Sequence, residues 1–189
     1  LSMLMGYAGQ ISLGHAGFIA IGGYASAILT KNHAWHPIAA MCFGAVLAIC
    51  AALLVGLPSL RLRGHYLAMA TLGFGEIVFV ICTAALGLTG GPSGFSGVPY
   101  ISVPGYVFKS ELSKYYLVWG IAFIAVVLSL NIIHSRVGRA LRSIHGDETA
   151  AGAMGINVAF YKIQVFVYSA VLASVAGSLY VHHMRFVSP

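Results

Sequence analysis

The chain has 189 residues, of which 59% are hydrophobic and 7% are charged, and its mean hydropathy is +0.91. Soluble domains carry about 25% charged residues, so this composition excludes an ordinary soluble protein. The formal net charge is +6, but the basic residues lie in short loops and at the ends of apolar stretches. We therefore interpret them as determinants of membrane topology and exclude nucleic acid as a partner.

Five long apolar stretches predict an all-α, polytopic transmembrane helical bundle. Each is close to the ~20 residues that a helix needs to cross the hydrocarbon core. A backbone in lipid must satisfy its own hydrogen bonds, so stretches of this length are typical of spanning helices. We expect one transmembrane domain over residues 1–189, as a fragment of a protein with further spans. The five stretches cover residues 12–30, 37–57, 66–87, 115–134 and 163–182.

The first stretch, residues 12–30, is rich in small residues. Gly22 and Ser26 lie four residues apart, as do Gly23 and Ala27. Small residues let helix backbones approach closely in lipid, where no hydrophobic force drives association. We therefore expect this stretch to pack tightly against other helices, with flexibility for a conformational change as the alternative role of its glycines.

The loops between the stretches differ in their basic residues, which sets the expected orientation. Residues 58–65 carry Arg61 and Arg63, and residues 135–162 carry Arg136, Arg139, Arg142 and Lys162. Both segments fall on one side if all five stretches cross the membrane. The positive-inside rule places that side in the cytoplasm and residues 88–114 on the outer side.

Glu76 lies near the middle of the third stretch. A carboxyl group at that depth costs a few kcal/mol to insert and is a functional candidate for that reason. Two roles remain open: Glu76 lines a path through the membrane, or it makes a structural hydrogen bond between helices. Gln10 and His15, near the beginning of the first stretch, are further candidates for the same path.

Residues 88–114 are rich in glycine and proline, which predicts an ordered, turn-rich loop. No Gly-Lys-Ser/Thr sequence follows the glycines, so a nucleotide cradle is not expected there. The chain has 8 histidines and 3 cysteines, but their spacings form no ligand cluster. We predict neither a metal site nor a cofactor.

Residues 135–162 predict two capped helices between the last two stretches. Val137, Leu141 and Ile144 form an apolar stripe with helical spacing. Ser135 and Asp147 stand where N-caps are expected, before a first helix that ends at Gly146 and a second over residues 148–154. Gly155 is the expected left-handed stop. The segment either lies on anionic headgroups or docks a soluble partner, and we favour docking because two capped helices exceed what a connector requires.

The sequence TAAGAMG at residues 149–155 resembles the EAA-loop pattern of ABC importer permeases, with Thr149 where that family usually has glutamate and Glu148 beside it. In that family the loop forms a coupling helix that sits in a groove of the ATPase subunit. The resemblance implies an ATPase-coupling role for the following residues: Arg139, Arg142, Asp147, Glu148, Ala150, Ala151 and Gly155.

Four blocks resemble, in order, the LivM-type permeases of branched-chain amino-acid ABC importers: residues 6–18 (GYAGQISLGHAGF), 61–74, 88–94 and 138–157. The resemblance implies a permease subunit without its own ATPase site, in the bacterial inner (cytoplasmic) membrane. The implied partners are a second permease subunit, two ABC ATPase subunits and a periplasmic or lipoprotein amino-acid-binding protein. It also implies that ATP hydrolysis drives leucine, isoleucine or valine into the cytoplasm.

Three alternatives remain open at this point. A urea or short-chain amide permease of the same superfamily would share the architecture. A passive channel would need no ATPase-docking helices. An intramembrane enzyme would need paired catalytic groups at one depth, whereas Glu76 is the one acid within the apolar stretches.

Overall fold

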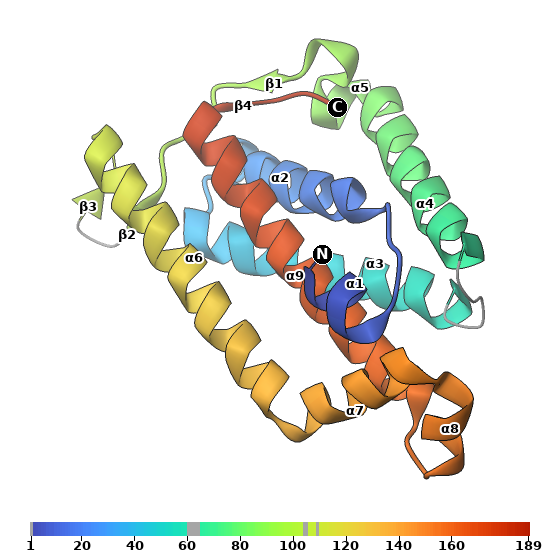
Figure 1. Cartoon of the computed structure of the whole chain (residues 1–189). Coiled ribbons are helices and arrows are strands. Elements are labelled where there is room, and N and C mark those ends of the chain that lie inside the picture. Colours follow the sequence, from blue (N-terminus) through green and yellow to red (C-terminus); the bar gives the residue numbers. More distant parts are fainter. Residues whose placement is uncertain (1, 60–64, 104–105, 109) are drawn as a thin grey trace.

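The computed structural model describes residues 2–59, 65–103, 106–108 and 110–189, and helices dominate it (Figure 1). Very short strands and small helices occupy the connection between α4 and α6. In chain order the elements are α1 (Ser2–Ala8), α2 (His15–Asn32), α3 (Pro37–Ser59), α4 (His65–Ala84), α5 (Leu86–Thr89), the 3-10 helix η1 (Gly91–Ser93), β1 (Phe95–Ser96), β2 (Ser102–Val103), β3 (Tyr106–Val107), α6 (Glu111–His134), α7 (Arg136–Gly146), α8 (Glu148–Ala153), α9 (Val158–Met184) and β4 (Phe186–Val187).

The predicted all-α transmembrane bundle is confirmed. Among the described residues, four helices are long and apolar enough to cross a membrane, and they lie in α3, α4, α6 and α9. The predicted count of about five is close to this number. The difference is α2, whose many small and polar residues lower its hydropathy and which packs against α3, α4 and α9.

The first predicted stretch, residues 12–30, is helical from His15 onward as α2, and a break in the helical structure precedes it. α1 ends at Ala8, residues 9–14 are not helical, and α2 begins at His15. Gly9 adopts a φ of +62°, a left-handed conformation that glycine reaches without strain. The N–H of Leu13 donates to Thr71 Oγ1 at 3.0 Å, so a side chain of α4 satisfies backbone that leaves the helical pattern.

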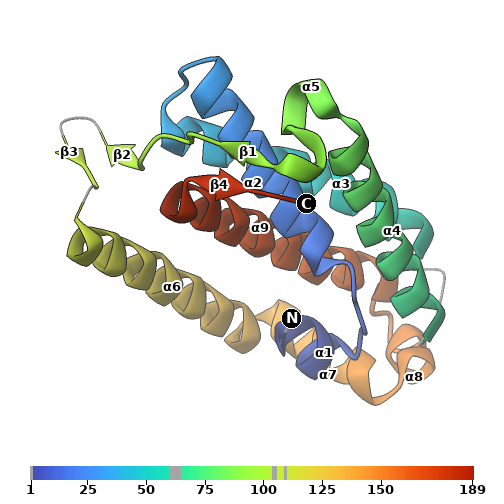
Figure 2. The same ribbon diagram turned by 90° about the horizontal axis from the view of Figure 1, so that it is seen from above.

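The centre of the bundle is formed by α2, α3 and α9, which pack on one another (Figure 2). A Cβ on Gly22 would lie 2.6 Å from Ser174 Cα, and a Cβ on Gly177 would lie 2.8 Å from the carbonyl carbon of Ile19. Gly44 of α3 also faces Gly22, but less closely, because a Cβ on Gly44 would lie 3.3 Å from the carbonyl oxygen of Gly22. The expected close packing of the first stretch is confirmed, because only residues without side chains fit at these crossings.

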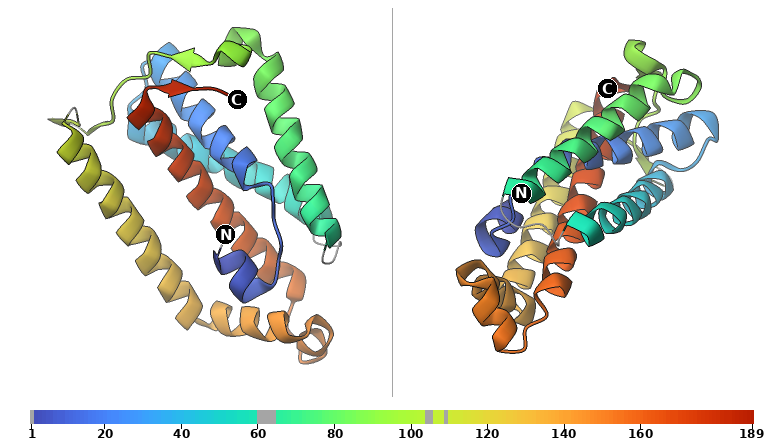
Figure 3. Two further views of the ribbon diagram at one scale, coloured as in Figure 1. Left: turned by 45° about the horizontal axis from the view of Figure 1, so that its top comes forward. Right: turned by 90° about the vertical axis from the view of Figure 1, so that its right-hand side faces the viewer.

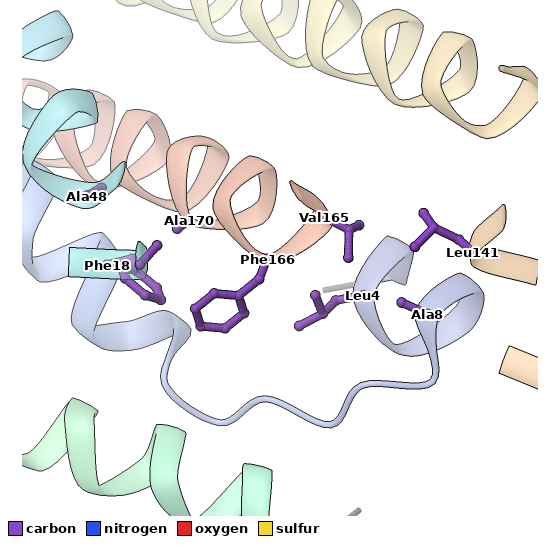
Figure 4. Close-up of a cluster of buried hydrophobic side chains, with 9 residues drawn as sticks. Leu4, Ala8, Phe18, Ala48, Leu141, Val165, Phe166 and Ala170 are labelled. Carbon is purple, nitrogen blue, oxygen red and sulfur yellow. The ribbon is translucent and has the colours of Figure 1, made fainter. Parts of the chain in front are cut away.

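Two buried apolar clusters lie at different levels of the bundle. The first joins α1, α2, α3, α7 and α9 through Leu4, Ala8, Phe18, Ala48, Ala52, Leu141, Val165, Phe166 and Ala170 (Figure 4). The second joins α2, α4, α9, β4 and the segment after η1 through Tyr24, Ala27, Val78, Cys82, Val98, Val181 and Val187.

α6 stands apart from the other long helices (Figure 3). No residue between Glu111 and His134 is buried. Ser129 Oγ and Tyr168 OH connect α6 to α9 at 2.8 Å, and an apolar cavity of about 790 Å³ separates the two helices nearer the start of α6. The apolar side chains of α6 are distributed around the helix, and none of them is buried in this chain. Such a helix is expected to contact lipid or further helices.

The two interhelical segments of interest lie at opposite ends of the long helices (Figure 1). At one end, β1 pairs antiparallel with β4, with Phe95 opposite Val187, and α6 begins at Glu111, before the end of the predicted loop 88–114. At the other end lie α7 and α8. The sequence also assigned Arg61 and Arg63 to this second end, but these residues lie outside the described part of the chain.

Candidate functional site

The α7–α8 segment has the local structure that the sequence predicts. Ser135 Oγ accepts from the N–H of Val137 at 3.1 Å, and Asp147 Oδ1 accepts from the N–H groups of Thr149 and Ala150. Both contacts are N-caps, which satisfy backbone donors that a helix leaves unpaired. Gly155 follows α8 with a φ of +83°. α8 itself is one residue shorter than predicted, because it ends at Ala153.

The apolar stripe of α7 attaches this segment to α1. Leu141 and Ile144 are completely buried, and Leu141 packs in the cluster that contains Leu4 and Ala8 (Figure 4). Arg142 turns back toward the bundle, since its guanidinium donates to the carbonyl of Ile133 at 3.1 Å. The segment is thus fixed on its inner face by apolar burial.

The predicted coupling residues differ in their exposure. Arg139 and Ala150 are exposed, together with Thr149 and Met154. Ala151 is buried and supports the segment, whereas Arg142 is exposed and also contacts the carbonyl of Ile133 in its own chain.

Glu148 forms an ion pair that the sequence did not predict. Its Oε1 accepts from Nζ of Lys162, which is 4% exposed at the beginning of α9. The two residues are separated by a helix end and a turn, so no helical spacing connects them. The sequence signal that could have suggested the pair is a lysine at the start of an otherwise apolar helix, beside a segment that contains acids.

Glu76 lies near the middle of α4 and is exposed at the surface of this chain. It makes no hydrogen bond or ion pair with any residue that the structure describes. The structural role in an interhelical hydrogen bond is therefore not seen within this part of the chain. The path-lining alternative stays a prediction.

Glu76 lines a largely apolar groove of about 430 Å³, which we call the α4 groove. Leu13, Ala16 and Gly17 line it at the beginning of α2, and Val187 lines it from β4. The groove thus runs from the helix break to the last residues of the chain. Its one carboxylate among apolar walls can bind a cationic group beside an aliphatic one.

His15 lies behind the α4 groove, at the depth of the bundle centre. Its Nδ1 contacts Ser12 Oγ at 3.2 Å and its Nε2 contacts Ser169 Oγ. Ser169 is near the middle of α9, and α2 and α9 run in the same direction because Ser26 contacts His182 further along both helices. The break before α2 therefore lies inside the bundle and not at its end.

Gln10 lies in the break and is 2% exposed, and neither polar atom of its side chain has a hydrogen-bond partner in the described structure. The structure does not bring Gln10, His15 and Glu76 into one site. Glu76 lines the α4 groove, whereas the other two are buried and do not line it.

The sequence did not predict that Tyr24 lines the α4 groove. Tyr24 lines the α4 groove, is 4% exposed, and has a hydroxyl with no hydrogen-bond partner in the described structure. A tyrosine within an apolar stretch gives no signal by itself. The sequence signal for the break is Gly9 and Gly14, which flank Gln10 and Ser12 next to an apolar stretch, as in the discontinuous helices of transporters, but an average of hydropathy does not detect it.

Comparisons with known proteins identify relatives over the whole chain. Residues 1–189 match the family described as branched-chain amino acid transport system / permease component. The chain is 33% identical to the high-affinity branched-chain amino acid transport system permease protein LivM of Escherichia coli (strain K12), over 100% of this chain and 50% of that protein. It is 32% identical to the protein of the same name from Salmonella typhimurium, with the same coverage.

A more distant relative comes from an archaeon. The probable branched-chain amino acid transport permease protein LivM of Methanocaldococcus jannaschii is 27% identical, over 95% of this chain and 61% of that protein. No solved structure matches the chain. The chain spans about half the length of the first two relatives.

Proposed function

The chain belongs to the family of branched-chain amino acid transport system permease components, and we propose that it is one permease subunit of an ABC importer. In this proposal the multi-pass subunit lies in the bacterial inner membrane. It moves leucine, isoleucine or valine into the cytoplasm together with a second permease subunit. ATP is hydrolysed by two partner ATPase subunits, and a periplasmic or lipoprotein binding protein delivers the amino acid.

The observation that carries the proposal is the α7–α8 segment. It projects from the end of the bundle, its helices are capped at both starts, and its inner face is fixed by buried Leu141. A rigid, exposed helix pair of this kind supports docking on a soluble partner, because little ordering entropy is lost on binding. We assign it to the cytoplasm as the ATPase-coupling element, with Arg139, Thr149 and Ala150 on the contact surface.

The α4 groove is the proposed substrate path. A carboxylate at the depth of Glu76 is costly in lipid, and Glu76 has no partner in the described chain. We therefore propose that the second permease subunit covers the groove and that the amino acid passes between the two subunits. Glu76 would pair with its ammonium group. His15 and Gln10 are proposed for the same path, although they do not line the groove in this structure.

The opposite end of the bundle is the proposed docking face for the binding protein. There cations from two helix ends hold residues 96–98 of the loop 88–114. Lys31 Nζ donates to the carbonyl of Ser96 at 2.7 Å, and Arg185 Nε donates to that of Val98 at 3.2 Å. Such contacts fix this part of the loop on the bundle, which favours recognition by a rigid partner.

Replacement of Glu76 by alanine is expected to reduce amino-acid uptake about tenfold or more, because a charge-assisted contact contributes roughly 1.5–3 kcal/mol. The ATPase subunits should remain bound, since Glu76 lies far from α8 along the helices. The measurement is uptake into vesicles together with copurification of the ATPase. Thr83→Val is the control, because Thr83 lies on the same helix, α4, but does not line the groove. Wild-type uptake by Glu76→Ala would contradict a role of Glu76 in the substrate path and would favour a structural role.

The function as a whole is tested by uptake of labelled leucine into vesicles that hold the full-length complex, with and without ATP. We expect ATP-dependent uptake that excess urea does not inhibit. Inhibition by urea would favour the amide-permease alternative, and uptake that persists without ATP would favour a passive channel.

A further inference from the structure

Lys162 is a buried cation at the beginning of α9. It is 4% exposed, and its Nζ donates to Oε1 of Glu148, the first residue of α8. A charged side chain with this burial is tolerated only when it is paired. The N-terminal end of a helix does not favour a cation, so the position within α9 gives no reason for a lysine. The partner in α8 does.

The ion pair bridges the turn between α8 and α9. Residues 154–157 connect the two helices, and Gly155 within them has a φ of +83°. The N–H of Ile156 donates to the carbonyl of Ala151 at 3.1 Å, so the backbone around this glycine makes one connection across the turn. The contact between Glu148 and Lys162 crosses the turn and adds a second connection.

α9 is the helix through which this connection reaches the bundle centre. It packs against both α2 and α3, and Ser178 Oγ donates to the carbonyl of Gly22 at 2.9 Å. Because the crossing of α2 and α9 has no space for independent movement of the two backbones, a displacement of α9 is transmitted to α2.

The position of Glu148 on α8 directs its side chain toward α9 and not toward the exposed surface of the segment. Thr149 is exposed, whereas the neighbouring Glu148 faces Lys162. Consecutive residues of a helix point in different directions. An acid at position 149 would therefore lie on the outer surface of α8, whereas the acid at position 148 lies on the side that faces α9.

We propose that Lys162 is a positioning residue that, through its ion pair with Glu148, fixes α8 relative to α9, so that movement imposed on α8 reaches the spanning helices. The inference rests on the proposed function, in which α8 docks on an ATPase. It assigns the coupling of ATP hydrolysis to transport in part to a contact inside the permease subunit.

The test measures ATP hydrolysed per leucine transported, in vesicles that hold the full-length complex. Lys162→Met keeps a long side chain but removes the pair, and Glu148→Gln removes it from the other side. Each is expected to raise the ratio about fivefold or more. The double variant Glu148→Lys with Lys162→Glu should restore it to within about twofold of wild type, because a swapped pair keeps the contact.

Ser129→Ala is the control. It removes the contact between Ser129 Oγ and Tyr168 OH, at 2.8 Å between α6 and α9, and should leave the ratio unchanged. A wild-type ratio in both Lys162→Met and Glu148→Gln overturns the proposal. So does a charge-swapped variant that melts like wild type but stays as uncoupled as the single variants.

The proposed function is tested separately within the same experiment. Absence of ATP-dependent leucine uptake by the wild-type complex counts against the importer itself. Normal uptake by the wild type with unaffected variants counts against Lys162 alone. If Glu148→Gln does not fold, because it leaves the buried ammonium of Lys162 without this carboxylate, Lys162→Met decides the test, since the Glu148 side chain that it leaves behind is 33% exposed.

Discussion

Replacement of Gly177 by valine is expected to prevent α2 and α9 from packing and to abolish the stable bundle. A Cβ at this position would lie 2.8 Å from the carbonyl carbon of Ile19 and even closer to its oxygen. These are backbone atoms in the first half of α2, so relief requires a shift of the helix and not only of a side chain. Overpacking of a core costs about 1–3 kcal/mol when side chains can adjust, and we expect more here because the obstacle is backbone.

The experiment compares Gly177→Val with Gly120→Val in thermal unfolding and in the yield of folded protein in mild detergent. Both glycines lie inside spanning helices, and both changes carry the same difference in helix propensity. A Cβ on Gly120 meets nothing within 4 Å, so only the helix crossing distinguishes the two variants. Equal melting temperatures for both would contradict the close α2–α9 contact. Gly22→Val, which meets Ser174, should reproduce the effect of Gly177→Val.

The features that the sequence predicted well depend on neighbours along the chain. The caps at Ser135 and Asp147 and the left-handed turn at Gly155 follow from local hydrogen bonds and from the missing side chain of glycine. The spanning helices follow from hydropathy, which sums over ~20 residues. In both cases the determining interactions lie within one turn or one helix, so the sequence contains them.

The features that the sequence did not predict depend on contacts between distant segments. The break before α2 is stabilised by Thr71 of α4, and an average over apolar residues conceals it. The pairing of Lys162 with Glu148 requires the orientation of α8 against α9. The exposure of Glu76 depends on which face α4 turns toward the bundle, and a helix that is apolar on all sides gives no such direction.

Replacement of Gly155 by valine is expected to uncouple ATP hydrolysis from transport while the subunit still inserts in the membrane. The position has a φ of +83°, where a side chain costs about 1–2 kcal/mol and a β-branched one more. A Cβ there meets nothing within 4 Å, so the change strains the backbone without a clash. The turn should respond by changing the direction of α8, and the long helices should keep their packing.

The backbone argument for Gly155 can be separated from the addition of bulk at the surface of α8. Gly155→Asn adds a side chain that tolerates the left-handed conformation, so it should keep far more transport per ATP than Gly155→Val. Gly152→Val adds the same side chain as the test variant at a position with equally open surroundings but without a positive φ. Wild-type transport per ATP in Gly155→Val would contradict the argument, and so would equal losses in Gly155→Asn and Gly155→Val. Loss in Gly155→Val alone would show that the angle of α8, and not its surface, limits the coupling.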